Sequence, residues 1–192
     1  MTTHGVRKIV VKGTSGSGKS TLAAVLANRF DLTWIELDAL FHGPNWSQPA
    51  TEEFRARVNA AMATSRNGWV IDGNYDSWLN ETVIAAADMI VWLDLPLRVK
   101  LWRIANRTHY RIRNNVELWN GNRESWREQL TRRDSIFIET ITKHRLHRNR
   151  WPARFANDDR LIRLRSERDV QRWLDEIVSP TLIPMGKTVA ED

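Results

Sequence analysis

The sequence predicts an α/β fold: an open, mostly parallel five-stranded sheet with helices on both faces. Short runs of β-branched and apolar residues alternate along the chain with longer stretches of helical spacing, which is the pattern of strand–helix–strand units. The run 89–93 is apolar throughout, as expected for a strand that helices cover on both sides. The 192 residues predict one domain over 1–178, followed by a loose tail over 179–192.

The elements follow from periodicity and turn residues. In chain order, the predicted strands are 7–12, 34–37, 68–75, 89–93 and 160–165. Helical spacing predicts helices that begin near residues 22, 51, 78, 97, 126 and 167. The helix from Trp78 is expected to reach Ala87, and the helix from Trp126 to continue past Ile141 until Pro152 interrupts it. The arginine-rich segment 111–125 breaks the pattern and is predicted to be a lid.

A glycine-rich turn joins the first predicted strand to the first helix. It reads Gly13-Thr14-Ser15-Gly16-Ser17-Gly18-Lys19-Ser20-Thr21 and matches G-x-x-x-x-G-K-[ST], the phosphate-binding P-loop. The glycines let successive N–H groups point inward, and the N-terminus of the helix attracts anions. We therefore predict that residues 13–21 bind the phosphates of ATP, with Lys19 as a catalytic group on the β- and γ-phosphates. The loop alone does not separate ATP from GTP.

Oxygen ligands of the kind that Mg²⁺ prefers are placed to meet beside this loop. The Ser20 hydroxyl follows the lysine, and Asp72 ends an apolar strand before Gly73. Because the carboxyl ends of parallel strands lie at one edge of a sheet, Ser20 and Asp72 are predicted to hold Mg²⁺, partly through water. Asp94 ends the next strand and competes for this role, but Leu95-Pro96 follows it at once, which favours Asp72.

Asp38 follows the second predicted strand at the same edge, and His42 lies four residues further on. A carboxylate there can accept the proton of an acceptor hydroxyl or orient that hydroxyl, so Asp38 is predicted to be catalytic. The alternative is that Asp38 only caps the turn that follows it. His42 alone is weak evidence of a ligand contact. The acceptor is expected to be an unidentified small molecule or nucleotide.

Arginines recur on the helix predicted from residue 97. Arg103, Arg107 and Arg111 are spaced by four and share a face, and Arg123 lies beyond the helix. Phosphoryl transfer spreads negative charge over equatorial oxygens, which arginines of a closing lid can meet. Arg107, Arg111 and Arg123 are therefore predicted to be catalytic, and Arg107 also to contact the nucleotide. The alternative for any one of them is a solvated helix face.

Positive charge is concentrated in one region of the chain. Fourteen basic and five acidic residues lie between Arg98 and Arg150, whereas the formal net charge of the whole chain is +6. Tryptophans interleave with arginines between Trp102 and Trp151, as they do on surfaces that bind single-stranded nucleic acid. A nucleotide-dependent nucleic-acid-binding protein is therefore the alternative function. Three further tryptophans lie near predicted loops, where a ring can stack on a ligand: Trp46, Trp78 and Trp119.

Composition limits the remaining classes. The chain has no cysteine, so disulfides and thiolate metal sites are excluded. The first residues are not followed by the apolar segment of a secretory signal, and no apolar run approaches the roughly 18 residues of a membrane span. We therefore expect a cytoplasmic protein that does not associate with membranes. The oligomeric state is left open.

The motifs resemble those of the adenylate-kinase-like small P-loop kinases, through the P-loop, the strand end Val70-Ile71-Asp72-Gly73 and the arginine-flanked lid. The chain is similar in more detail to the topology modulation proteins, which share four segments: 35–40, 70–75, 91–96 and 117–125. The resemblance covers most of residues 6–178. It implies a P-loop NTPase fold with a five-stranded parallel sheet, a mobile lid and Mg-ATP binding, and hence an ATP-dependent phosphotransferase.

One segment departs from the adenylate kinases. They usually carry Asp-Gly-Phe-Pro-Arg at the third strand, and the arginine helps to hold the acceptor phosphate, whereas this chain has Asn74-Tyr75-Asp76 after the glycine. The resemblance therefore does not imply a nucleoside monophosphate as acceptor. The segment Asp38-Ala39-Leu40-Phe41-His42 instead resembles the acceptor side of small hydroxyl kinases such as gluconate kinase.

Overall fold

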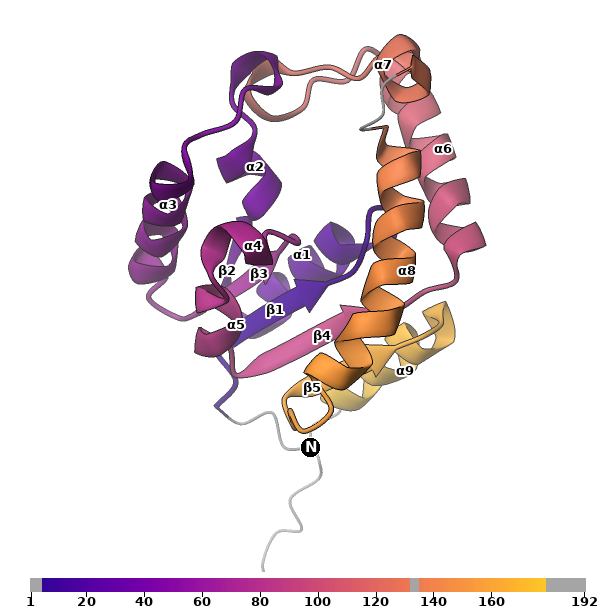
Figure 1. Cartoon of the computed structure of the whole chain (residues 1–192). Coiled ribbons are helices and arrows are strands. Elements are labelled where there is room, and N and C mark those ends of the chain that lie inside the picture. The colour runs from indigo at the N-terminus through magenta and orange to yellow at the C-terminus, as the bar shows by residue number, and fades with distance from the viewer. Residues whose placement is uncertain (1–4, 132–134, 179–192) are drawn as a thin grey trace, which may run out of the picture.

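A parallel five-stranded sheet forms the centre of the molecule (Figure 1). The computed structural model describes residues 5–131 and 135–178, so the predicted tail over 179–192 lies outside the described residues. The strands are β1 (Lys8–Lys12), β2 (Thr33–Glu36), β3 (Trp69–Asp72), β4 (Met89–Leu93) and β5 (Leu161–Leu164), and their order across the sheet is β2-β3-β1-β4-β5. All four neighbouring pairs are parallel. This confirms the predicted fold class, with small shifts at the ends of the strands.

Helices and short turns connect the strands. They are α1 (Lys19–Phe30), α2 (Leu37–Phe41), the 3₁₀ turn η1 (Pro44–Trp46), α3 (Thr51–Thr64), α4 (Asp76–Leu79), α5 (Thr82–Ala86), α6 (Leu97–Arg113), the 3₁₀ turn η2 (Trp119–Gly121), α7 (Trp126–Thr131), α8 (Ile136–Arg154) and α9 (Glu167–Val178). Within the described residues, no helix is both long and apolar enough to cross a bilayer.

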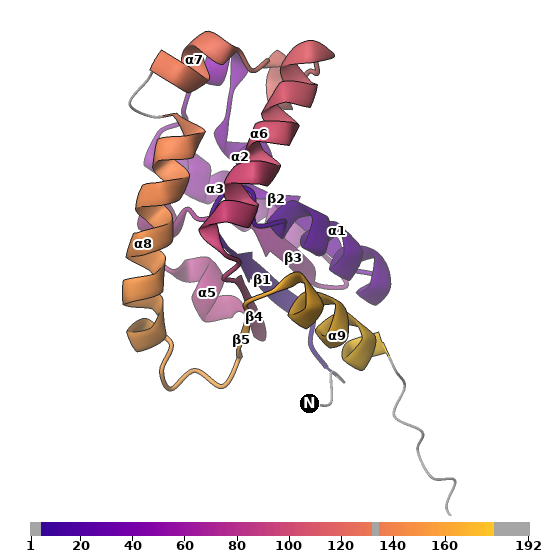
Figure 2. The same ribbon diagram turned by 90° about the vertical axis from the view of Figure 1, so that its right-hand side faces the viewer.

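Helices pack on both faces of the sheet, as the apolar strands require (Figure 2). Alternate residues of β1 point to opposite faces, so Ile9 and Val11 belong to one apolar cluster and Val10 to the other. The cluster of Ile9 and Val11 includes α1 and Trp173 of α9. The cluster of Val10 includes residues of α3, α4 and α5 and Trp151 of α8. The two layers fix the sheet, and the loops at its carboxyl edge carry the polar residues.

The structure corrects two of the predicted helices. The stretch expected to form one helix from 78 to 87 forms α4 and α5, because Asn80 and Glu81 adopt left-handed backbone angles (φ 46° and 61°) that no helix continues through. The long helix expected from 126 is likewise divided into α7 and α8. Pro152 does not interrupt α8 but lies in its last turn, two residues before the helix ends at Arg154.

The segment between α6 and α7 crosses above the carboxyl edge of the sheet and reaches the turn after α2 (Figure 1). Two asparagine amides hold it there. The Asn120 side chain donates to the carbonyl of His42 at 2.6 Å, and the Asn122 side chain donates to the carbonyl of Gly43 at 2.9 Å. In return, the backbone N–H of Trp46 donates to Asn122 Oδ1 at 2.8 Å. The predicted lid therefore comprises the end of α6 and a segment docked on η1; its mobility stays a prediction.

Candidate active site

The P-loop leaves β1 at Gly13 and enters α1 at Lys19. Its three glycines have positive φ angles, and two of them have no room for a side chain. A Cβ on Gly13 would lie 2.5 Å from Ser17 Oγ, and one on Gly16 would lie 2.4 Å from the carbonyl of Lys100. No side chain caps the first turn of α1, so its N–H groups remain for an anionic ligand. The loop therefore fits the predicted phosphate cradle.

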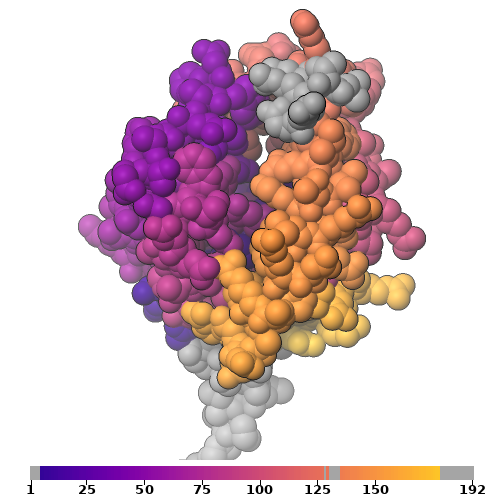
Figure 3. All heavy atoms as spheres, viewed as in Figure 1, coloured from indigo at the N-terminus to yellow at the C-terminus, as the bar shows by residue number. Residues whose placement is uncertain are grey.

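A cleft of about 1500 Å³ opens above this loop. Figure 3 shows the hollow between the N-terminal half of the chain and α8, drawn in orange. Most of the residues that the sequence singled out line this cleft: residues 14–21, Asp38, His42, Trp46, Trp78, Arg103, Arg107, Arg111 and Trp119. The three tryptophans predicted to lie beside a ligand all line it.

Lys19 lies partly buried at the base of the cleft. Its Nζ lies 3.5 Å from the carbonyl of Thr14, which is a long and weak hydrogen bond. Burial lowers the pKa of Lys19, and the carboxylates of Asp38 and Asp72 act in the opposite direction. Within the described part of the chain no carboxylate contacts this desolvated ammonium directly, so it is suited to donate to the phosphate oxygens of a nucleotide.

Ser20 and Asp72 meet as the sequence predicted. Ser20 Oγ donates to Asp72 Oδ2 at 2.6 Å, and the indole N–H of Trp34 donates to Asp72 Oδ1 at 3.1 Å. Burial raises the pKa of Asp72, although both hydrogen bonds oppose this shift. Mg²⁺ prefers such oxygen donors and keeps several waters, so this pair fits the predicted ion. Within 5–131 and 135–178 no cluster of three His or acidic residues could hold a metal, so phosphates and water would supply its other ligands.

Asp94, the competing candidate for the metal, is engaged elsewhere. Its side chain is 1% exposed and lies 2.6 Å from Arg163 Nη2 and 3.5 Å from Arg148 Nε. Arg163 also stacks on the ring of Trp92, with its Cζ 4.2 Å from the ring centroid. These contacts place Asp94 in an ion-pair cluster that joins β4, β5 and α8.

Asp38 follows β2, as the sequence suggested, and lies in the first turn of α2. Its carboxylate accepts a hydrogen bond from the Tyr75 hydroxyl at 2.6 Å, and it makes no hydrogen bond to the turn that follows. This geometry argues against the capping alternative. Burial and the charge of Asp38 raise the pKa of Tyr75, so the phenol keeps its proton and donates. Burial lowers the pKa of His42, whose ring faces the same cleft.

Three of the four predicted arginines line the cleft from α6. Arg103 pairs with Glu167 at 2.7 Å, and Arg111 pairs with Glu124 at 2.8 Å. Arg107 lies between them without an ion pair among the described residues, and its buried Nε has no hydrogen-bond partner. Burial lowers the pKa of this guanidinium. A buried cation without a paired anion is unfavourable, so Arg107 is suited to bind an anionic ligand.

Arg123 is the exception. Its guanidinium donates to the carbonyl of Asn115 at 2.9 Å and lies 3.6 Å from Glu117, on the outer side of the crossing segment. It does not line the cleft. This placement does not support the predicted catalytic role, because a group that faces away from the P-loop is not positioned to meet a transferred phosphoryl group.

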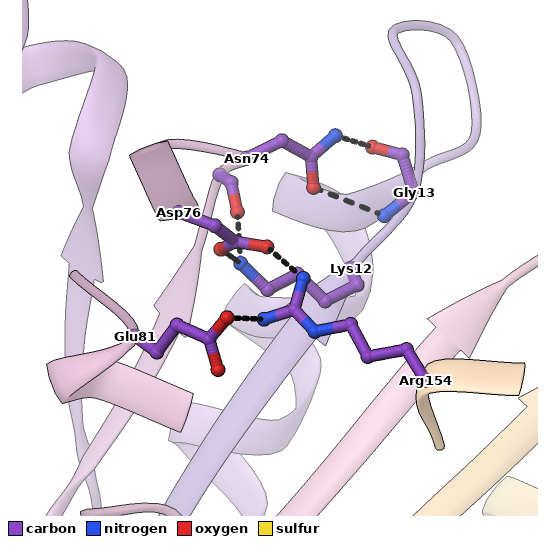
Figure 4. Close-up of polar contacts among 7 residues, drawn as sticks. Lys12, Gly13, Asn74, Asp76, Glu81 and Arg154 are labelled. Atoms are coloured by element: carbon purple, nitrogen blue, oxygen red, sulfur yellow. Dashed lines mark hydrogen bonds and ion pairs between the residues drawn. The ribbon is translucent and has the colours of Figure 1, made fainter. Parts of the chain in front are cut away.

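Sequence reasoning missed a clamp on the P-loop. The Asn74 side chain donates to the carbonyl of Gly13 at 2.7 Å, and its Oδ1 lies 3.5 Å from the N–H of Gly13 (Figure 4). The segment after β3 thereby holds the first glycine of the loop. The sequence does contain a signal, because Asn74 stands where a change from the adenylate-kinase pattern begins, but nothing local identifies Gly13 as its partner.

A buried ion-pair network lies beneath this clamp (Figure 4). Lys12, the last residue of β1, is 2% exposed; its Nζ donates to the carbonyl of Gly73 at 3.2 Å and pairs closely with Asp76. Arg154 of α8 lies 3.2 Å from Asp76 and 3.2 Å from Glu81. Three consecutive residues therefore have three partners: Asn74 holds the P-loop, Tyr75 holds Asp38, and Asp76 holds Lys12.

The sequence of this chain is similar to those of known kinases. No family model matches the chain. It is 29% identical over 160 residues to the cytidylate kinase of Haloquadratum walsbyi, covering 75% of this chain and 82% of that protein. It is 22% identical over 165 residues to the cytidylate kinase of Sulfolobus acidocaldarius, covering 79% and 78%. A match to the uncharacterized protein YqaC of Bacillus subtilis has 26% identity and covers 57% of this chain and only 61% of that protein.

Solved structures give the same result for the fold. A shikimate kinase from Acinetobacter baumannii has a TM-score of 0.53 at 18% identity, covering 94% of this chain and 97% of that one. A gluconokinase from Sinorhizobium meliloti has a TM-score of 0.50 at 20% identity, covering 89% and 93%. The finer resemblance to the topology modulation proteins stays a prediction. The chain has the fold of the small P-loop kinases, with a glycine-rich loop, a serine–aspartate pair and an arginine-lined cleft at the carboxyl edge of its sheet.

Proposed function

We propose that this protein is an ATP-dependent phosphotransferase that transfers the γ-phosphoryl group of Mg-ATP to a small-molecule or nucleotide acceptor. The observation that carries the proposal is the convergence of two pairs on one cleft. Ser20 of the P-loop lines the cleft and donates to Asp72, and Asp38 and Tyr75 line the cleft from α2 and from the turn after β3. The first pair suits the donor nucleotide, and the second suits a hydroxyl that must lose its proton.

Each residue has a distinct role in this proposal. The backbone of residues 13–18 and the Lys19 ammonium bind the phosphates, while Arg107 supplies the unpaired guanidinium that accepts the charge spread over the transferred group. Arg111 is already paired with Glu124, so its role is to keep α6 and the crossing segment in place beside the cleft. Ser20 and Asp72 would hold Mg²⁺, which, when bound, neutralises charge on the β- and γ-phosphates.

The relatives support the reaction class and leave the acceptor open. Four of them are cytidylate kinases, whose identity to this chain lies between 22% and 29%. A P-loop lysine opposite a carboxylate suits phosphoryl transfer to any hydroxyl acceptor, so this arrangement does not identify the acceptor. A cytoplasmic location stays a sequence-based prediction.

Replacing Asp38 by asparagine tests the acceptor side. We expect kcat to fall by about 10²- to 10⁴-fold, because a general base contributes on that order, while the Kd of ATP changes less than about threefold. ADP formation and nucleotide titration of the tryptophan fluorescence measure the two quantities. Asp159→Asn, at an exposed carboxylate, is the matched control. Equal losses in kcat and in ATP affinity would contradict an acceptor role for Asp38.

A second candidate function rests on the outer face of α6. Trp102 and Tyr110 are 69% and 63% exposed, and the same stripe of the helix carries the exposed Arg98 and Arg113. Exposed rings beside arginines suit single-stranded nucleic acid. If this face binds it, affinity for a fluorescent oligonucleotide falls steeply between about 50 and 200 mM salt, and Trp102→Ala weakens binding at least about tenfold. Absence of binding at low salt would remove this candidate.

A further inference from the structure

The two sides of the cleft differ in their charged groups. Arg103, Arg107 and Arg111 lie on the α6 side, with Lys19 at its base. Three carboxylates also line the cleft, each paired with a cation: Glu167 with Arg103, Glu124 with Arg111 and Glu139 with Lys143. On the α2 side the charged groups that line the cleft are the carboxylates of Glu36 and Asp38. Burial and the neighbouring carboxylates Asp72 and Asp38 raise the pKa of Glu36, although its hydrogen bond from Trp119 and the charge of Arg111 oppose the shift. The donor triphosphate therefore has cations on one side of the cleft, and the acceptor meets acids on the other.

The arginines nearest to the α2 side are not available to an acceptor. Arg55 donates to the carbonyl of Trp78 at 2.7 Å and pairs with Glu52 at 2.6 Å. Arg57 donates to the carbonyl of Leu40 at 3.0 Å and also pairs with an acid of its own helix. Neither of them lines the cleft. Lys143 of α8 also lines the cleft, and it pairs with Glu139. Among the described residues, the groups that an acceptor phosphate would meet on the α2 side are thus carboxylates, and the unpaired guanidinium of Arg107 lies on the α6 side.

Aromatic rings form the rest of the α2 side. His42 lies edge-on to Trp46, with ring centroids 5.3 Å apart, and stacks against Trp119 at 5.8 Å. Tyr75 and Trp78 complete this wall. The buried Nδ1 of His42 has no hydrogen-bond partner among the described residues, so it can bond to a polar group of a ligand. Aromatic faces beside carboxylates suit the apolar face of a polyhydroxyl compound, or an amine.

We propose that the acceptor is a small hydroxyl compound that carries no phosphate and is either uncharged or amine-bearing. This inference rests on the proposed function. The acceptor hydroxyl oxygen forms a bond to the γ-phosphorus, and the bond from that phosphorus to the β–γ bridging oxygen breaks. The bridging oxygen leaves with the electron pair as part of ADP. The hydroxyl proton passes to the Asp38 carboxylate and then to solvent, so that the step consumes no further reactant.

Matched pairs of acceptors, with and without a phosphate group, test whether the enzyme prefers an acceptor that carries no phosphate. ADP formation is measured with saturating Mg-ATP and with cytidine or CMP, glucose or glucose 6-phosphate, and glucosamine or glucosamine 6-phosphate. We expect kcat/KM to be at least about tenfold higher for the unphosphorylated member of every pair that is turned over, because juxtaposed like charges are unfavourable. Glu36→Gln should narrow this ratio severalfold, whereas Glu176→Gln, at an exposed position of α9, should leave it unchanged.

The outcomes separate this inference from the proposed function. If the enzyme prefers CMP or another phosphorylated compound, and Lys19→Ala abolishes this activity, the proposed acceptor class is overturned. The kinase assignment then stays intact. If ADP formation depends on Lys19 but none of the tested compounds increases it, the proposed acceptor class is also overturned. Absence of Lys19-dependent ADP formation in every arm removes the proposed function itself. An unchanged ratio in Glu36→Gln contradicts the electrostatic reason for the preference.

Discussion

Replacing Lys19 by alanine is expected to lower kcat by about 10²- to 10³-fold, the loss that follows removal of one preorganised group that stabilises developing charge. The free energy of unfolding should not fall. Among the described residues, Lys19 makes a long hydrogen bond to Thr14 and no ion pair, and burial lowers its pKa although Asp38 and Asp72 oppose this shift. The nucleotide-free protein therefore holds a partly desolvated cation without a carboxylate in direct contact. Activity and stability should therefore respond to this substitution in different ways.

The measurement combines ADP formation with urea unfolding of the same preparations. Lys8→Ala is the matched control, because Lys8 lies on β1 with an exposed side chain. The control should keep its activity and its stability within about 0.5 kcal/mol. A Lys19 variant that retains wild-type turnover would contradict the phosphate-binding role, and one that unfolds at lower urea would show that Lys19 acts mainly in the fold.

The sequence was sufficient for features that depend on local pattern. The P-loop has fixed spacing, and its strand and helix follow without a gap, so the donor site could be placed from residues 8–30 alone. The pairing of Ser20 with Asp72 could be predicted because parallel strands bring their carboxyl ends to one edge. The face shared by Arg103, Arg107 and Arg111 follows from helical spacing.

Features that depend on distant partners could not be predicted. Asn122 and Gly43 are 79 residues apart, and nothing in either segment specifies the other. The same holds for Asn74 and Gly13, which lie 61 residues apart. Arg123 differs from the other arginines. Its proximity in sequence to the lid arginines suggested a shared role, whereas its guanidinium bonds to the carbonyl of Asn115 and does not line the cleft.

The turn after β3 contacts both the P-loop and α2, which carry the proposed donor and acceptor groups. Successive side chains of a turn point in different directions, so Asn74, Tyr75 and Asp76 can each reach a different element. Their partners are the first glycine of the P-loop, the candidate base on α2, and the last residue of β1. Catalysis of phosphoryl transfer depends mainly on positioning and charge. A substitution in this short turn is therefore expected to displace groups on both sides of the cleft.

Asp76→Ala is expected to lower the free energy of unfolding by roughly 2–4 kcal/mol, because it leaves the Lys12 ammonium buried without its carboxylate. The Asp76 side chain is 23% exposed, which places the effect toward the lower end. Burial would raise the pKa of Asp76, but Lys12 and Arg154 together lower it. The stabilisation is therefore present above the unfolded value of about 4 and is lost as the pH falls through the lower folded value.

A double-mutant cycle separates a buried unpaired charge from simple loss of packing. If the unpaired ammonium is the cause, Lys12→Met combined with Asp76→Ala should be more stable than Asp76→Ala alone, because methionine fills the same space without a charge to bury. Urea unfolding at pH 7 measures each variant, and the exposed Asp159→Ala serves as control. The difference between Asp76→Ala and the wild type should shrink below about pH 4. Additive losses in the double variant, with no dependence on pH, would mean that Lys12 and Asp76 contribute independently to the stability of the fold.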